Sequence, residues 1–138
     1  MRTAQTCFVL SAALLLGLGL VHLACTFSGP RLTPRDPALL ALMQEVSPVL
    51  TRRTTMWRAW LGFNASHSLG AIFFGLVYGW LALIQPLLLA RSPFLLGLGL
   101  AMLTAYALLG RAYWFSVPNA GITVSLLAFA TGALLAPR

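Results

Sequence analysis

Lysine is missing from this chain, and only two residues, Asp36 and Glu45, carry a carboxylate. Charged residues make up 8% of the 138 residues, against about 25% in a soluble domain. All nine basic residues are arginines. They never occur in runs longer than two, so we expect no nucleic-acid partner. With 59% hydrophobic residues and a mean hydropathy of +0.88, the surface must face lipid, and the bilayer is the predicted partner.

The few carboxylates and cysteines exclude several kinds of chemistry. Asp36 and Glu45 both lie outside the apolar runs, so acid/base chemistry by carboxylates inside the membrane is excluded. Cys7 and Cys25 fall on one predicted helix, about 27 Å apart at a rise of ~1.5 Å per residue, and cannot form a disulfide with each other. No G-x-S-x-G elbow of a serine hydrolase and no phosphate-binding loop occurs.

Four long apolar runs predict an all-α fold, an integral membrane four-helix bundle that forms a single transmembrane domain over residues 1–138. The predicted spans are listed here in order: about 5–27, 56–84, 94–115 and 118–135. Pro86 and Pro93 bracket the second turn, and Pro118 opens the last helix. The first run is expected to remain as a span, because His22 interrupts the pattern of a lipoprotein cleavage site before Cys25.

The one sizeable loop, residues 28–55, contains a predicted short helix over residues 37–47. Asp36 is its expected N-cap and Pro37 its first helical residue. The spacing of Leu39, Leu42, Met43 and Val46 places these four side chains on one face. We expect the helix to lie at the membrane surface or to cover the bundle, and we prefer an interfacial linker over a functional lid.

The distribution of the arginines predicts the orientation of the chain in the membrane. One group lies on the side of the chain ends: Arg2, Arg91 and Arg138. The other lies on the side of the long loop: Arg31, Arg35, Arg52, Arg53, Arg58 and Arg111. The excess predicts a cytoplasmic long loop with both termini outside.

Polar residues concentrate in the predicted leaflet on the side of the long loop. His22 and His67 fall at matched depth there because their helices run in opposite directions. Their rings are therefore predicted within roughly 10 Å of each other. The same leaflet receives Tyr106, Arg111, Asn119 and Thr123, whereas the opposite leaflet is expected to be nearly pure hydrocarbon, including residues 8–16 and 126–135.

Helical spacing divides the span 56–84 into faces. Trp60, Asn64 and His67 share one face, and Gly62, Ser66 and Gly70 form a small-residue stripe suited to close helix packing. If the protein is instead a structural or accessory subunit, an exposed small-residue stripe such as Gly75 with Gly79 would serve partners in a homo-oligomer or a larger membrane complex.

These residues predict a polar pocket that binds a lipophilic small molecule with a carbonyl or anionic head. His22 and His67 are the candidate catalytic residues, since only imidazole or phenol groups are placed to move a proton. The candidate ligand-binding residues are Arg58, Trp60, Asn64, Tyr106 and Arg111. No cofactor is identified, and no metal site is predicted because no HxxxH spacing or nearby carboxylate occurs.

Two other interpretations stay open. The polar residues would only join helices in a structural or accessory subunit, or the two histidines would ligate haem b in an electron-transfer protein.

Three stretches carry a resemblance to a known family: "GLVH" at residues 19–22, "MWRAWLGFNASHSLG" at 56–70 and "YWFSVPNAG" at 113–121. The chain resembles small bacterial four-helix membrane proteins of the DoxX-like superfamily, which are largely uncharacterised. The resemblance implies a compact bundle in the bacterial inner membrane. It also implies a lipophilic redox ligand such as a quinone, because some relatives are subunits of quinone-linked oxidoreductases.

This chain lacks the cysteine pair that dithiol chemistry would need. Sterol-isomerase bundles, a rival likeness, depend on membrane-embedded acids that this chain also lacks.

Overall fold

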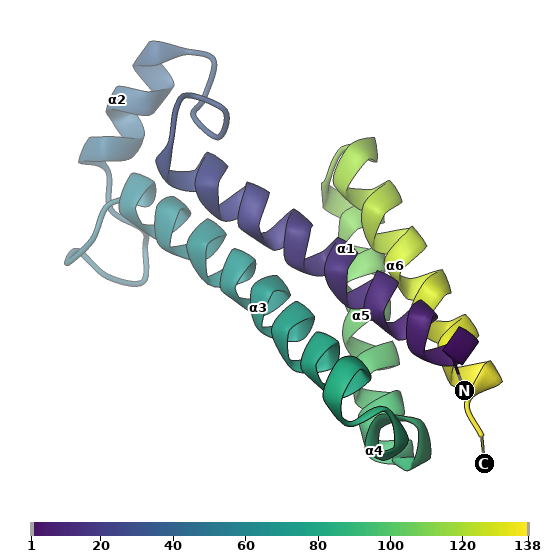
Figure 1. Ribbon diagram of the computed structural model, residues 1–138. Coiled ribbons are helices and arrows are strands. Elements are labelled where there is room, and N and C mark those ends of the chain that lie inside the picture. Colours follow the sequence, from purple (N-terminus) through teal and green to yellow (C-terminus); the bar gives the residue numbers. More distant parts are fainter. Residues whose placement is uncertain (1, 138) are drawn as a thin grey trace. The chain divides into compact units, whose positions relative to one another are not determined.

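The computed structural model describes residues 2–137; most of these are helical, and none of them lies in a strand. The helices, in order, are α1 (Arg2–Phe27), α2 (Pro37–Glu45), α3 (Met56–Ile84), α4 (Pro86–Arg91), α5 (Pro93–Tyr113) and α6 (Ser116–Leu135) (Figure 1). The predicted all-α fold with four long helices and a short loop helix is confirmed. Helix α4, within the turn bracketed by two prolines, was not predicted, and α2 ends two residues before the predicted boundary.

Four helices are long and apolar enough to cross a membrane: α1 with 26 residues, α3 with 29, α5 with 21 and α6 with 20. At ~1.5 Å per residue even the shortest spans the hydrocarbon core of about 30 Å. Large apolar side chains are exposed along all four, including Leu10, Phe63, Leu108 and Leu127. An exposed apolar surface of this kind is stable in lipid, and the protein is a multi-pass membrane protein.

Side chains at the helix starts explain two of the boundaries. The Asp36 carboxylate accepts a hydrogen bond from the backbone N–H of Ala38 at 2.8 Å, and Pro37 follows it. This arrangement confirms the predicted N-cap. Before α5, the Ser92 hydroxyl accepts a hydrogen bond from the N–H of Leu95 at 3.2 Å, and Pro93 stands in the first turn.

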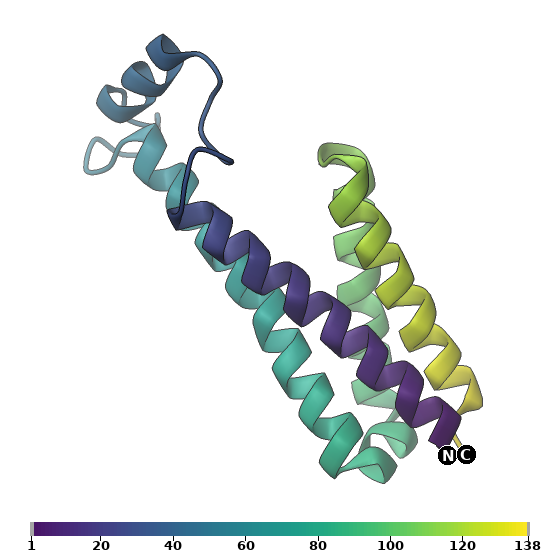
Figure 2. The ribbon, with the colours of Figure 1, turned by 45° about the horizontal axis from the view of Figure 1, so that its top comes forward.

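The chain divides into two compact units. The loop-side unit is Gly19–Gly70, and the four-helix unit comprises the residues up to Leu18 and those from Ala71 onward. The four-helix unit contains parts of α1 and α3 with all of α5 and α6, and α5 and α6 lie side by side in it (Figure 2).

An aromatic cluster fills the core of the four-helix unit. Phe129 of α6 is 0% exposed. Its ring centre lies 5.1 Å from that of Phe8, 5.3 Å from that of Tyr78 and 6.1 Å from that of Phe74. The cluster joins α1, α3 and α6, and edge-on ring pairs of this kind add to the packing energy.

At Gly75, α3 packs closely against α1 within the four-helix unit. A Cβ there would lie 2.5 Å from Leu16 Cβ and 2.9 Å from the Ala12 carbonyl oxygen. Gly79 also faces α1, because a Cβ at this residue would lie 3.6 Å from Ala12 Cβ. The prediction of an exposed Gly75–Gly79 stripe for partners is therefore wrong, because α1 of the same chain occupies that surface.

Polar contacts also occur where nearly pure hydrocarbon was predicted. The Ser11 and Ser125 side chains are both buried, and their hydroxyl oxygens are 2.9 Å apart. The Tyr78 hydroxyl donates to the Leu95 carbonyl at 2.8 Å, and the Gln5 amide donates to the Ala82 carbonyl at 2.9 Å. These bonds satisfy polar groups that lipid would leave unpaired, and they join helices within the four-helix unit.

Candidate functional site

The loop-side unit holds the last part of α1 beside the first part of α3, with the loop folded onto α3. The Trp60 indole N–H donates to the Leu32 carbonyl at 3.0 Å. The backbone N–H of Met56, the first residue of α3, donates to the Val46 carbonyl at 2.8 Å. Two contacts therefore secure the loop, one before α2 and one after it.

Three predicted residues come together in this unit. His22 Nε2 of α1 lies 3.1 Å from Asn64 Oδ1 of α3. The ring centres of His22 and His67 are 5.5 Å apart, with their planes at 86°. The prediction that the two rings approach within roughly 10 Å is confirmed. Both histidines are half-buried, so the cluster is partly accessible from outside the protein.

The Asn64 amide settles which ring nitrogen of His22 carries hydrogen. Asn64 Nδ2 donates to the Trp60 carbonyl, one turn back on α3, at 2.9 Å. The amide oxygen therefore faces His22 and can only accept. Nε2 of His22 must be the donor, so Nδ1 is the acceptor nitrogen whenever this ring is neutral.

The hydroxyl groups around the cluster are bonded to their own helices. Thr26 donates to the His22 carbonyl at 2.8 Å, and Ser68 donates to the Asn64 carbonyl at 2.8 Å. Ser66 donates to the Phe63 carbonyl at 3.0 Å. Bonds of this type satisfy a hydroxyl in an apolar surrounding without a ligand. These hydroxyl groups are therefore satisfied within their own helices, and the groups of the cluster that can contact a ligand are the two imidazoles and the Asn64 amide.

The other predicted ligand-binding residues have different surroundings. Trp60 is 43% exposed, and its indole N–H is used by the loop contact. Arg58 is exposed in the first turn of α3, where its backbone N–H bonds to the Thr55 hydroxyl at 3.3 Å. Tyr106 and Arg111 belong to the four-helix unit. There Tyr106 is buried with its ring 6.5 Å from that of Trp114, and Arg111 is exposed.

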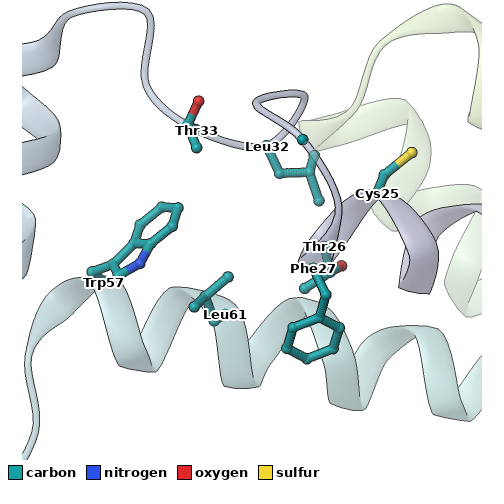
Figure 3. Close-up of a pocket in the computed structure, with 8 residues that line it drawn as sticks. Cys25, Thr26, Phe27, Leu32, Thr33, Trp57 and Leu61 are labelled. Atoms are coloured by element: carbon teal, nitrogen blue, oxygen red, sulfur yellow. The ribbon is translucent and has the colours of Figure 1, made fainter.

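A cavity of about 170 Å³ lies in the loop-side unit, toward the loop from the histidine cluster. Its lining residues are Cys25, Thr26, Phe27, Gly29, Leu32, Thr33, Trp57 and Leu61. Figure 3 shows Leu32 of the loop facing Trp57 and Leu61 of α3 across the cavity. Thr26 connects the two features, since it lines the cavity and bonds to the His22 backbone.

Sequence reasoning missed this cavity. Trp57 and Leu61 stand four residues apart on one face of α3, and Cys25 stands one turn beyond His22. Those spacings are visible in the sequence. The folding of Leu32 over them is not, because it depends on the path of the loop.

Arg31 lies at the surface near Cys25. Its Nη1 donates to the Cys25 sulfur at 3.4 Å. This hydrogen bond raises the pKa of the Arg31 guanidinium above its ordinary value. The guanidinium therefore remains a permanent positive charge at the end of α1.

The two-histidine cluster does not fit haem ligation. An iron held by both rings needs two nitrogen–metal bonds of about 2 Å and a flat slot for the macrocycle between the rings. Here the rings meet edge to face at 5.5 Å, and His22 Nε2 is bonded to Asn64. Among residues 2–137, no three His, Cys, Asp or Glu side chains are grouped to hold a metal ion.

We therefore expect purified protein to show no Soret band, even when haem b is added during expression. The measurement is an absorbance spectrum of oxidised and dithionite-reduced protein. A Soret band present in the parent and lost in both His22→Ala and His67→Ala would contradict this prediction and establish bis-histidine ligation.

Comparison of the chain with protein-family models, with curated proteins and with solved structures finds no match. Its function is therefore inferred from its own residues.

Proposed function

We propose that the loop-side unit binds the head of a lipophilic small molecule, such as a quinone or a lipid, beside the histidine cluster. The observation that carries this proposal is the hydrogen bond between His22 and Asn64 at 3.1 Å, with the His67 ring 5.5 Å from that of His22. Two imidazoles within membrane-spanning helices are unfavourable in lipid, and ionisable residues of this kind usually serve a ligand or a proton.

The chemistry of the cluster suits a carbonyl or anionic head. An imidazole both donates and accepts hydrogen bonds, and it changes charge near neutral pH. Asn64 fixes the orientation of the His22 ring through bonds to Nε2 and to the Trp60 carbonyl. A proton delivered to a bound ligand would come from His22 or His67, because both carboxylates of the chain lie in or next to α2.

The adjacent cavity supports a ligand that is mostly apolar. Phe27, Leu32, Trp57 and Leu61 provide an aromatic and aliphatic lining. At about 170 Å³ the cavity is smaller than the ~300 Å³ of the smallest usual ligand pockets. It would therefore hold part of a ligand, while the rest lies against the half-buried histidines or in the bilayer.

Membership of the DoxX-like superfamily and a place in the bacterial inner membrane are parts of this proposal. They rest on the three sequence stretches named above, one of which contains Asn64 and His67. A quinone is the ligand that this resemblance favours.

A structural or accessory subunit is the second candidate. It is favoured by the same hydrogen bond, because His22 and Asn64 join α1 to α3 directly. Such bonds contribute only ~0.6 kcal/mol on average in membrane proteins. In this case the histidines would stabilise the helix pair and contact no ligand.

Replacing His67 by glutamine separates the two candidates. Glutamine keeps a donor and an acceptor but loses the aromatic, titratable ring. If His67 contacts a ligand, the melting temperature should stay close to that of the parent, while affinity for a short-tailed ubiquinone falls about tenfold, or ~1.4 kcal/mol, because the amide offers the ligand head neither the aromatic face nor the exchangeable charge of the ring. Ser66→Ala is the matched control, since Ser66 is exposed one residue away and bonds only to its own helix.

The measurements are equilibrium binding of the quinone in detergent and mass spectrometry of the lipids and quinones that copurify. Equal quinone binding by the parent, His67→Gln and Ser66→Ala would contradict the proposal that His67 contacts the ligand. A large drop in melting temperature with no bound lipophile in the parent would favour the structural role.

A further inference from the structure

The segment between α1 and α3 exposes apolar side chains that the described residues do not cover. Helix α2 has no buried residue, and Leu39, Leu42 and Val46 are each about half exposed along one face. Just after α2, Val49 is fully exposed and Leu50 is 93% exposed. Bulky apolar residues at a loop tip would be unfavourable in water, so this surface needs an apolar environment.

Arginines flank these apolar residues in the sequence. Arg31, Arg35, Arg52 and Arg53 are all exposed within the segment, and Arg58 follows in the first turn of α3. The only acidic side chains of the chain belong to Asp36, which precedes α2, and Glu45, the last residue of α2. The Asp36 carboxylate is already engaged as the N-cap of that helix. The segment therefore presents excess positive charge beside an apolar tip.

Backbone hydrogen bonds close the turn that forms the tip of this surface. The N–H of Met56 bonds to the Val46 carbonyl at 2.8 Å, which closes the turn that carries Val49 and Leu50. Within that turn the N–H of Arg53 bonds to the Thr51 hydroxyl at 3.2 Å. The apolar tip and the Arg52–Arg53 pair are thus neighbours within one closed turn.

We propose that this segment docks on anionic phospholipid headgroups, with Val49 and Leu50 inserted at the acyl boundary and Arg52 and Arg53 paired with phosphates. Two observations select lipid as the occupant. The segment starts where α1 ends and finishes where α3 begins, so it lies at the headgroup level of a bilayer that both helices cross. Its charge complements phosphate, which guanidinium groups bind bidentately.

This docking surface is separate from the proposed ligand site, because it uses neither His22 nor His67. Apolar side chains flanked by basic ones are the usual composition of an interfacial membrane anchor. Docking would fix the depth of the loop-side unit in the leaflet, with the cavity between the headgroups and the histidines.

The experiment uses the full chain with Cys7→Ala and Cys25→Ala, and a nitroxide label attached at Val49→Cys. The protein is reconstituted in vesicles of phosphatidylcholine alone or mixed with phosphatidylglycerol. Label accessibility to oxygen and to a water-soluble nickel chelate then reports depth. A label at Phe73→Cys, exposed in the middle of α3, gives the value for the hydrocarbon core.

We expect the Val49 label to be more accessible to oxygen than to the nickel chelate. It should lie deeper in the bilayer when phosphatidylglycerol is present. Combining Arg52→Gln with Arg53→Gln should remove that lipid dependence. Arg91→Gln, an exposed arginine in the turn after α3, should keep it. Quinone binding by the Arg52→Gln/Arg53→Gln and Arg91→Gln variants should match that of the Cys7→Ala/Cys25→Ala parent from which they are made, so failure here is distinguishable from failure of the ligand proposal.

Three results would overturn the inference. The label could be open to the nickel chelate in both kinds of vesicle, which places the tip in water. Its depth could be the same with and without phosphatidylglycerol, which removes the anionic headgroup. Strong spin–spin broadening between labels would show that a second copy of the chain covers the tip.

Discussion

Replacing Gly75 by alanine is expected to lower the free energy of unfolding by about 1–3 kcal/mol, the usual effect of overpacking a close contact. The added methyl would lie 2.5 Å from Leu16 Cβ and 2.9 Å from the Ala12 carbonyl oxygen. One of these neighbours is backbone, so no side-chain rotation can relieve the overlap. Helices α1 and α3 must move apart within the four-helix unit, and that movement loosens packing along both.

Two glycines serve as matched controls. At Gly17 of α1 and at Gly62 of α3, an added Cβ would meet nothing within 4 Å beyond its chain neighbours and the backbone of its own helix. Alanine at either site should leave stability unchanged or raise it by up to about 1 kcal/mol, because alanine is the better helix former. The measurement is unfolding in bicelles by steric trapping. Gly75→Ala with the stability of the two controls would show that α1 and α3 are not in contact there.

The sequence predicted the spans well because hydropathy is a strong signal over 20 residues. The Asp36–Pro37 start of α2 was also predictable, since capping depends on neighbouring residues alone. Helix α4 was not predicted, because six residues between two prolines carry too short a pattern to distinguish a helical turn from a loop.

The histidine pair could be predicted because depth follows from counting residues along two antiparallel helices. His22 and His67 were expected at one level, and their rings lie 5.5 Å apart. The contact of Trp60 with Leu32 could not be predicted, since it depends on the fold of a loop of nearly 30 residues. Helical spacing placed Trp60 on the face of Asn64 and His67. It did not predict which group would accept a hydrogen bond from the Trp60 indole N–H.

The role of each small-residue stripe was the hardest feature to predict. In a membrane helix both the packed face and the lipid face are apolar, so composition does not tell them apart. Gly75 proved to be buried against α1, whereas Gly62 and Ser66 are exposed. Single serines are equally uninformative, because a hydroxyl can bond to its own helix, as Ser68 does, or to another helix, as Ser125 does.

Replacing Phe129 by alanine should destabilise the four-helix unit by about 2 kcal/mol. In a soluble protein such a change costs more, about 3–5 kcal/mol, because the side chain also loses its transfer from water. Within a bilayer the unfolded helix keeps Phe129 in lipid, which is as apolar as the core, so that transfer contribution is absent. The remaining loss is packing around the cavity, at about 24 cal/mol per Å³ of space left open.

Phe73→Ala is the matched control, since Phe73 is 69% exposed and Phe129 is fully buried. Lipid fills the space that Phe73 leaves, so its removal should change stability by less than about 0.5 kcal/mol. Unfolding of parent and both variants in the same bicelles measures the difference. Equal effects at the two sites would mean that the rings of Phe8, Phe74 and Tyr78 close over the gap. A larger effect at Phe73 would mean that a partner chain, rather than lipid, covers that face of α3.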